Sequence, residues 1–296
     1  DIRGIIQKLD YLKSLGVDII WLCPVYESPN DDNGYDIADY RNIMSEFGTM
    51  ADFDELLEGL HQRGLKLVMD LVVNHSSDEH VWFEESRLSK NNPYRDYYIW
   101  KPGKNGGPPN DWQAFFGGSA WEHDELTDEY YLHLFTTKQP DLNWENPKVR
   151  EEVADIVKFW FDKGIDGFRM DVISLISKRP DYANMVSDVF EDTIREQYAN
   201  GPRIHEFLKE LNKNVLSKYD IMTVGEGPGI TLDHGLNYVD ESREELDMVF
   251  HFDHMFIDFG PGGKFDPQPY DLVEFKNIFS RWEEKLKDKG WGSIFL

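Results

Sequence analysis

Apolar runs that alternate with amphipathic segments are the feature that most constrains the fold of this chain. Four runs end in polar residues: Val17–Val25, Leu65–Val73, Gly167–Ile173 and Ile221–Glu226. Two shorter strand candidates follow, Met248–Asp253 and Ser293–Leu296. Strands that are apolar on both faces and alternate with helices are typical of a parallel sheet covered on both sides. The alternation therefore predicts an α/β fold.

Four segments between these runs have the spacing of apolar residues expected of a helix: Met50–Arg63, Pro147–Lys163, His205–Tyr219 and Glu274–Lys287. Polar residues gather at the C-terminal ends of the predicted strands, which favours a (β/α)₈ TIM barrel over an open sheet. A dinucleotide-binding fold is disfavoured, because no Gly-rich phosphate loop follows the first strand. Since six strands cannot close an eight-stranded barrel, we expect the barrel to be incomplete in this chain.

Residues 76–140 interrupt the alternation. They are rich in Trp, Tyr, Asn, Gly and Pro, and include the Gly/Pro-rich stretch Lys101–Pro109. A structureless loop of this length is implausible inside a compact domain. We predict a small irregular subdomain inserted after the third barrel strand. Most aromatic residues are expected in the core, and Trp100, Trp112 and Trp121 are the best candidates for stacking on a ligand.

The composition excludes several classes of partner. The 296 residues contain 56 Asp and Glu against 31 Lys and Arg, a net charge of −25, so we expect no nucleic-acid or anionic-membrane partner. No apolar stretch approaches 18 residues, so we expect no membrane span. The single cysteine, Cys23, excludes an internal disulfide and fits a reducing, cytoplasmic location. Because Cys23 lies in an apolar run, we predict a core thiol.

The segment Gly167–Val172 contains the strongest chemical signal. Residues i and i+2 of a strand point to the same side, so Arg169 and Asp171 project together at the strand's end. A guanidinium favours the ionised form of a neighbouring carboxylate, which a glycosidase nucleophile requires. A purely structural ion pair explains the same spacing equally well.

Two further strand ends carry candidate functional residues. Glu226 precedes a Gly/Pro turn; alone it is nonspecific, but paired with Asp171 it becomes a candidate general acid. Two carboxyl groups about 5 Å apart would indicate a retaining mechanism. His75 follows the run that contains Asp70, either as a structural residue or as a hydrogen-bond partner of a sugar hydroxyl. A metal site at His75 is disfavoured, because no second His or Cys stands at ligand spacing.

Taken together, Asp70–His75, Gly167–Val172 and Val224–Glu226 resemble three of the four short regions that mark the α-amylase family of glycoside hydrolases (glycoside hydrolase family 13). The segments Asn33–Ile37, Phe47–Phe53 and Gln139–Trp144 are similar to its oligo-1,6-glucosidase subgroup. The resemblance covers essentially the whole chain, and the combination of motifs is far more specific than any one of them.

The resemblance implies roles for individual residues. Asp171 matches the nucleophile, Glu226 the acid/base, and Arg169 the arginine that orients the nucleophile. Four residues match contacts to the non-reducing-end glucose, with the tyrosine as a stacking platform: Asp32, Tyr35, Asp70 and His75. Asp1 resembles the last residue of an aspartate-rich calcium loop, but the rest of that loop is not present in the sequence. The resemblance implies no required cofactor and leaves a structural calcium ion open.

The resemblance also implies a domain organisation. Residues 1–75 would carry barrel strands 2 and 3, residues 76–140 the inserted subdomain, and residues 141–296 strands 4 to 7. The first strand, the last strand and a C-terminal β-domain would be absent. The family's fourth region, which holds a third carboxylate, would then lie beyond Leu296.

The function implied is a retaining, exo-acting α-glucosidase that hydrolyses α-1,6 bonds of isomalto-oligosaccharides, as a monomer. Val172 follows the nucleophile, and valine there accompanies α-1,6 cleavage in similar enzymes; simple packing between strands is the alternative. The same carboxylates also fit an α-1,4-glucosidase, a dextran glucosidase, a sucrose isomerase or a trehalose-6-phosphate hydrolase. A catalytically dead ectodomain that partners a membrane transporter is the non-enzyme alternative, disfavoured because Asp171, Glu226, Arg169 and His75 are all present.

Overall fold

The computed structural model describes residues 1–187, 189–260 and 263–293. The chain forms two compact units. Unit 1 contains residues 1–171, 181–185 and 214–222, and unit 2 contains residues 172–180, 186–213 and 223–296. Each unit is built on parallel strands that alternate with helices, which confirms the α/β alternation predicted from the apolar runs.

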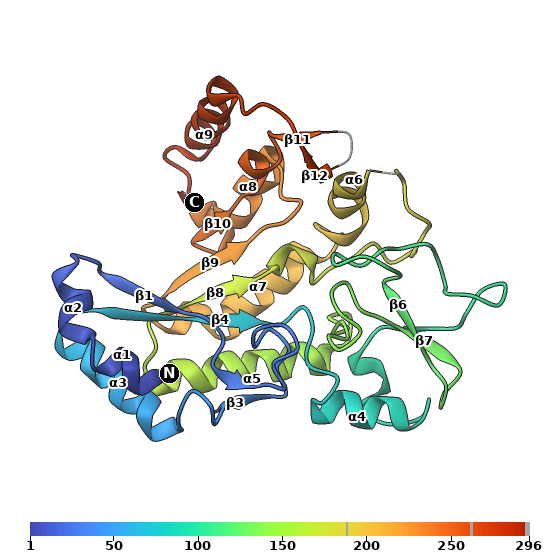
Figure 1. Ribbon diagram of the computed structural model, residues 1–296, viewed down its shortest axis with the longest axis horizontal. Helices are drawn as coiled ribbons and strands as arrows, with labels where there is room; N and C mark the ends of the chain where they lie inside the picture. Colours follow the sequence, from blue (N-terminus) through green and yellow to red (C-terminus); the bar gives the residue numbers. More distant parts are fainter. Residues whose placement is uncertain (188, 261–262, 294–296) are drawn as a thin grey trace. The chain divides into compact units, whose positions relative to one another are not determined.

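Unit 1 contains three parallel strands in the order β1 (Ile19–Leu22), β4 (Lys66–Val72) and β8 (Gly167–Asp171) (Figure 1). Every residue of β8 is buried, as is β4 from Leu67 onward. All three strands lie inside the predicted runs. Unit 1 also contains the short elements α1 (Ile2–Ile6), α2 (Leu9–Ser14), β2 (Tyr26–Glu27), β3 (Asp39–Ile43) and η4 (Leu216–Lys218).

Helices α3 (Met50–Gln62) and α5 (Pro147–Lys163) begin and end at residues that suit helix termini. Thr49 and Asp52 form a capping box at the start of α3, each side chain accepting from the other residue's backbone N–H. At the end of α5, Gly164 adopts the left-handed conformation at φ 101°. The buried Trp160 of α5 packs edge-on against Phe53 of α3, with ring centroids 5.1 Å apart. These helices bury their apolar faces as the spacing predicted.

Residues 76–140 contain regular structure rather than a long loop. Figure 1 shows α4 (Val81–Leu88) beside β6 (Trp121–Asp124) and β7 (Glu129–Leu132). An antiparallel sheet has the order β5 (Trp100–Lys101), β7, β6, and η1 (Arg95–Tyr97) precedes it. The buried guanidinium of Arg95 lies 3.5 Å from the Trp100 ring centroid and pairs with Glu129 at 2.6 Å. We retain the proposal that this segment is an inserted subdomain.

Unit 2 contains the parallel strands β9 (Met222–Glu226), β10 (Met248–Phe250) and β13 (Trp291–Ser293), in that order. Its longer helices are α7 (Ile204–Asn214), α8 (Leu232–Val239) and α9 (Leu272–Leu286). The shorter elements are η2 (Ile173–Leu175), α6 (Phe190–Thr193), η3 (Ile194–Tyr198), η5 (Glu241–Arg243), η6 (Asp253–Met255), β11 (Phe259–Gly260) and β12 (Gly263–Pro267).

Three sequence expectations need correction. The helix predicted over His205–Tyr219 ends at Asn214, because Val215 leaves the helical region at φ −136° and ψ −61°. The last strand begins at Trp291, two residues before the predicted start at Ser293, and the rest of that prediction, residues 294–296, lies outside the described residues. Cys23 is exposed rather than a core thiol, since Ile19 and Trp21, which share its side of the chain, are 42% and 39% exposed.

Among the helices described, none is long and apolar enough to cross a membrane.

The buried His80 gives unit 1 a predicted pH dependence. Its Nδ1 accepts from the Trp82 N–H at the start of α4, and burial lowers the His80 pKa to about 3. The neutral ring is therefore favoured in the folded state. Its contribution to stability is present above the unfolded pKa of about 6.5 and is lost as pH falls toward 3.

We expect His80→Asn to retain the helix cap and remove this titration. The free energy of unfolding should then fall less steeply between pH 6 and 4, by up to about 1.4 kcal/mol per pH unit. Urea unfolding at a series of pH values measures both slopes. Equal slopes for the wild type and the variant would show that His80 binds no additional proton on unfolding.

Candidate active site

A buried cluster of charged side chains joins β4 to β8 in unit 1. The strand register sets Asp70 opposite Arg169 and Val72 opposite Asp171. Arg169 Nη1 donates to Asp70 Oδ1 at 2.8 Å and to Asp171 Oδ1 at 2.5 Å. These three residues are at most 7% exposed. A cation thus lies against the predicted nucleophile and against a second carboxylate, in surroundings where charge interactions are strong.

Aromatic donors hold the second carboxylate. Asp70 Oδ2 accepts from the Tyr35 hydroxyl at 3.1 Å and from Trp21 Nε1 at 3.2 Å. Burial, followed by the negative charge of Asp70, raises the pKa of Tyr35 far above its usual value of 10. The Tyr35 hydroxyl therefore stays protonated and acts as a donor toward Asp70.

His75 belongs to a second group of polar contacts in unit 1. Its Nε2 lies 3.1 Å from the Tyr35 carbonyl oxygen and 3.3 Å from Gln139 Nε2. The same Gln139 amide donates to Asp32 Oδ2 at 3.0 Å. His75 is 1% exposed, and its ring centroid lies 4.9 Å from that of Phe135. The structure thus brings the predicted sugar contacts Asp32, Tyr35 and His75 together through Gln139.

Gln139 and Phe135 were missed as site residues. Gln139 begins the segment Gln139–Trp144, whose similarity to the oligo-1,6-glucosidase subgroup is a signal that marks this residue. No pattern in the sequence distinguishes Phe135 from the chain's other phenylalanines.

Val172 and Glu226 meet in unit 2. The backbone N–H of Val172 donates to Glu226 Oε2 at 3.0 Å. Glu226 ends β9 between two glycines, and each glycine is needed at its position. A Cβ on Gly225 would lie 2.8 Å from Ile173 Cγ2, and one on Gly227 would lie 2.9 Å from the Phe250 carbonyl oxygen. The glycines therefore allow the Glu226 strand end to pack closely against its neighbours.

The remaining expectations concern calcium and aromatic stacking. The Asp1 carboxylate accepts from the Gly4 N–H at 2.6 Å and caps α1. Among the described residues, there is no group of three or more His, Cys, Asp or Glu that could hold a metal ion. Trp112 and Trp121 are only 1% and 2% exposed, so the expectation that they stack on sugar was wrong. The indole N–H of Trp112 instead donates to the Ala183 carbonyl oxygen of unit 1, and that of Trp121 donates to Asn110 Oδ1 within the subdomain.

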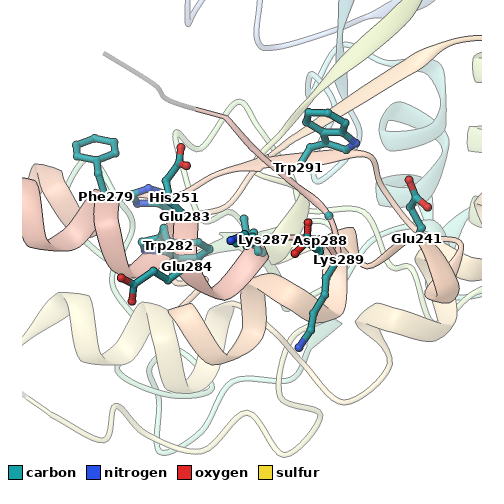
Figure 2. Close-up of a pocket in the computed structure, with 12 residues that line it drawn as sticks. Glu241, His251, Phe279, Trp282, Glu283, Glu284, Lys287, Asp288, Lys289 and Trp291 are labelled. Carbon is teal, nitrogen blue, oxygen red and sulfur yellow. The ribbon is translucent and has the colours of Figure 1, made fainter.

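A cavity of about 910 Å³ lies elsewhere in unit 2, next to α9 and β13. In Figure 2, Phe279, His251 and Trp282 gather on the left, with Trp291 and Glu241 on the right. His251 stacks flat on Trp282 at a centroid distance of 4.3 Å, and burial lowers its pKa to about 4. None of the predicted site residues lines this cavity. Its size therefore adds nothing to the assignment of the site.

Comparison with known proteins identifies the family of the chain. All of residues 1–296 match the family of α-amylase catalytic domains. The chain is 64% identical over 298 residues to the oligo-1,6-glucosidase of Parageobacillus thermoglucosidasius and 52% identical over 297 residues to the trehalose-6-phosphate hydrolase of Bacillus subtilis. The alignments cover 100% of this chain and 53% and 52% of those proteins. The crystal structure of the isomaltulose synthase of Protaminobacter rubrum is 47% identical, with a TM-score of 0.97 over 100% of this chain and 53% of that one.

The chain therefore belongs to the α-amylase family of glycoside hydrolases, and its fold is the parallel-stranded catalytic barrel of that family. The resemblance seen in the sequence motifs is confirmed. The chain spans about half the length of the curated relatives it matches, so the predicted incomplete barrel is also confirmed.

Proposed function

We propose that the protein carrying this chain is a retaining, exo-acting α-glucosidase that hydrolyses α-1,6 bonds at the non-reducing end of isomalto-oligosaccharides. The buried Asp70–Arg169–Asp171 cluster is the observation that carries the proposal, since it holds a carboxylate against a fixed cation at a strand end. The 64% identity to a protein named oligo-1,6-glucosidase supports the substrate class.

The proposed reaction has two steps. Glu226 donates a proton to the glycosidic oxygen as the Asp171 carboxylate attacks the anomeric carbon, which forms a covalent glucosyl-enzyme and releases the leaving sugar. Glu226, now ionised, then takes a proton from water, and that water displaces Asp171. Two inversions return the α-anomer. Arg169 holds one oxygen of Asp171 and so orients the carboxylate for attack.

The proposed contacts to the non-reducing-end glucose come from the polar residues gathered in unit 1. Asp32 and Asp70 would accept hydrogen bonds from sugar hydroxyls, and Tyr35 would present its ring for stacking. Gln139 joins this set, because its amide already contacts both Asp32 and His75. Because the Asp32 and Asp70 carboxylates are held in place, they would favour a sugar whose hydroxyl groups can donate to both.

Trehalose-6-phosphate hydrolysis and sucrose isomerisation are the main competing activities, because relatives at 52% and 47% identity carry those names. An α-1,4-glucosidase, a dextran glucosidase and the dead ectodomain remain as well. The test is kcat/KM for isomaltose, maltose, sucrose and trehalose-6-phosphate, with product analysis. We expect isomaltose to be preferred. A preference for trehalose-6-phosphate, isomaltulose formed from sucrose, or no turnover at all would each overturn the proposal.

We predict that Val172 determines linkage preference. Valine and threonine have similar shapes, so Val172→Thr mainly places a hydroxyl where a methyl group would otherwise desolvate the sugar without a hydrogen bond in return. We expect the ratio of kcat/KM for isomaltose to that for maltose to fall by about tenfold in the variant. Initial rates on both disaccharides give the ratio. An unchanged ratio would mean that linkage is recognised elsewhere.

We propose further that the enzyme acts as a cytoplasmic monomer and needs no cofactor. Its 56 acidic residues against 31 basic ones disfavour nucleic-acid and anionic-membrane partners, and its single cysteine suits a reducing compartment. Activity that survives extensive dialysis against a chelator would support the absence of a required metal ion. Loss of activity that calcium alone restores would contradict it.

A further inference from the structure

Val172 has an unusual backbone conformation. Its φ is 35° and its ψ is 40°, in the left-handed region. For a β-branched residue this conformation is a genuine outlier, because Cβ crowds the backbone. Such strain persists only where the surrounding structure over-determines it, and it concentrates at functional sites.

Hydrogen bonds on both sides hold the strained residue. Its N–H donates to Glu226 Oε2 at 3.0 Å, and its C=O accepts from the Leu175 N–H at 2.9 Å. Val172 is only 7% exposed, so packing also restrains it. Since both backbone polar groups are engaged, the direction of the N–H toward the Glu226 carboxyl group is fixed.

The segments that follow Val172 and Glu226 are also tied to each other. Ser174 Oγ donates to the Pro228 carbonyl oxygen at 2.7 Å. The Asn200 N–H donates to the Ser174 carbonyl oxygen at 3.0 Å, and its side-chain amide donates to the Gly229 carbonyl oxygen at 2.8 Å. These contacts join the two segments at several points, so the Val172 amide and Glu226 are held in one frame.

We propose that the Val172 backbone amide is a positioning group for the acid/base, and that it determines which oxygen of Glu226 carries the proton. The lone pair of Oε2 that accepts the Val172 N–H cannot also carry the carboxyl proton. The proton of the neutral carboxyl group is therefore held on Oε1, which is the oxygen that donates to the leaving group. This inference rests on the proposed function of Glu226.

The chemistry of the leaving group offers a selective test. An alkoxide leaving group, as from isomaltose, needs a proton from Glu226 while the C–O bond breaks. The fluoride of α-glucosyl fluoride leaves as a stable anion and needs almost no proton transfer. A misplaced general acid therefore lowers the rate on isomaltose alone, whereas a damaged glucose site lowers the rates on isomaltose and on α-glucosyl fluoride.

Replacing the Val172 amide with an ester, by incorporating the α-hydroxy analogue of valine into the complete protein, removes the N–H and keeps the side chain. We expect kcat/KM to fall about tenfold or more on isomaltose and to change less than about twofold on α-glucosyl fluoride. The matched control is the same amide-to-ester replacement at Ser242, whose exposed N–H donates to Asp240 Oδ1 at 2.9 Å and takes no part in holding Glu226. It should leave both rates within about twofold of the wild type.

A second variant keeps the inference testable if the ester folds poorly. Val172→Gly retains the N–H but removes the buried side chain whose packing restrains it. Its rate on aryl α-glucosides should depend more steeply on leaving-group acidity than the wild-type rate does. Equal losses on isomaltose and the fluoride, or an unchanged leaving-group dependence, would overturn the inference. A wild-type protein inactive on both sugars would instead refute the proposed function.

Discussion

Replacing Asp171 with alanine in the complete protein should lower kcat on isomaltose by about 10⁴-fold or more, because no covalent glucosyl-enzyme can form without the nucleophile. Glu226→Gln should lower kcat by about 10²–10⁴-fold, because the amide neither donates the proton nor later activates water. Steady-state kinetics on isomaltose measure both losses. Proton NMR of the first product released by the wild type should show the α-anomer.

The control for this prediction is Asp162→Ala, which removes an exposed aspartate of α5 that pairs with Lys158 and accepts from the Tyr219 hydroxyl. It should leave kcat within about twofold, and circular dichroism should show the same secondary structure in all variants. Substantial turnover by Asp171→Ala would rule out its role as nucleophile. Release of β-glucose by the wild type would refute the retaining mechanism.

Arg169→Leu should lower the free energy of unfolding by about 3–5 kcal/mol, because it removes a buried cation that contacts two buried carboxylates. Arg169→Lys should cost less, since the charge remains although an ammonium cannot reproduce the geometry of the guanidinium. Urea unfolding of the complete protein measures both losses. Activity should fall as well, because Asp171 loses the group that orients it.

A surface arginine provides the comparison. Arg41 lies 3.9 Å from Glu152, and both side chains are at least 36% exposed, so Arg41→Leu should cost no more than about 1 kcal/mol. If Arg169→Leu proved as mild as Arg41→Leu, the Asp70–Arg169–Asp171 cluster would contribute little to stability.

Most of the barrel elements could be predicted from the sequence, because their patterns are local. Pro147 and Gly164 mark the two ends of α5, and the predicted and observed bounds agree. The run Leu65–Val73 contains β4, since a strand buried on both faces leaves a near-continuous apolar signal, interrupted here by Lys66 and Asp70. The helix predicted over His205–Tyr219 was too long, because apolar spacing continues past Val215 while the backbone does not.

The candidate site was predicted only in part. Asp171, Glu226 and Arg169 stand in short motifs, so residue type and spacing identify them, although their roles remain proposals. Gln139 was missed because its contact with Asp32 joins residues 107 positions apart, which no local pattern records. The stacking role expected of Trp112 and Trp121 was wrong because aromatic residues are common both in cores and at sugar sites, and the sequence does not show which are buried.

The sequence by itself determined the succession of strands along the chain, the ends of several helices and the family. Each of these depends on residues that are close along the chain. Only the tertiary structure decided that Asp70 and Asp171 share one guanidinium, since this depends on the register between β4 and β8. It also decided that Val172 directs its amide at Glu226, 54 positions away. A left-handed valine is unfavourable by its local energetics, so only surrounding contacts can impose it.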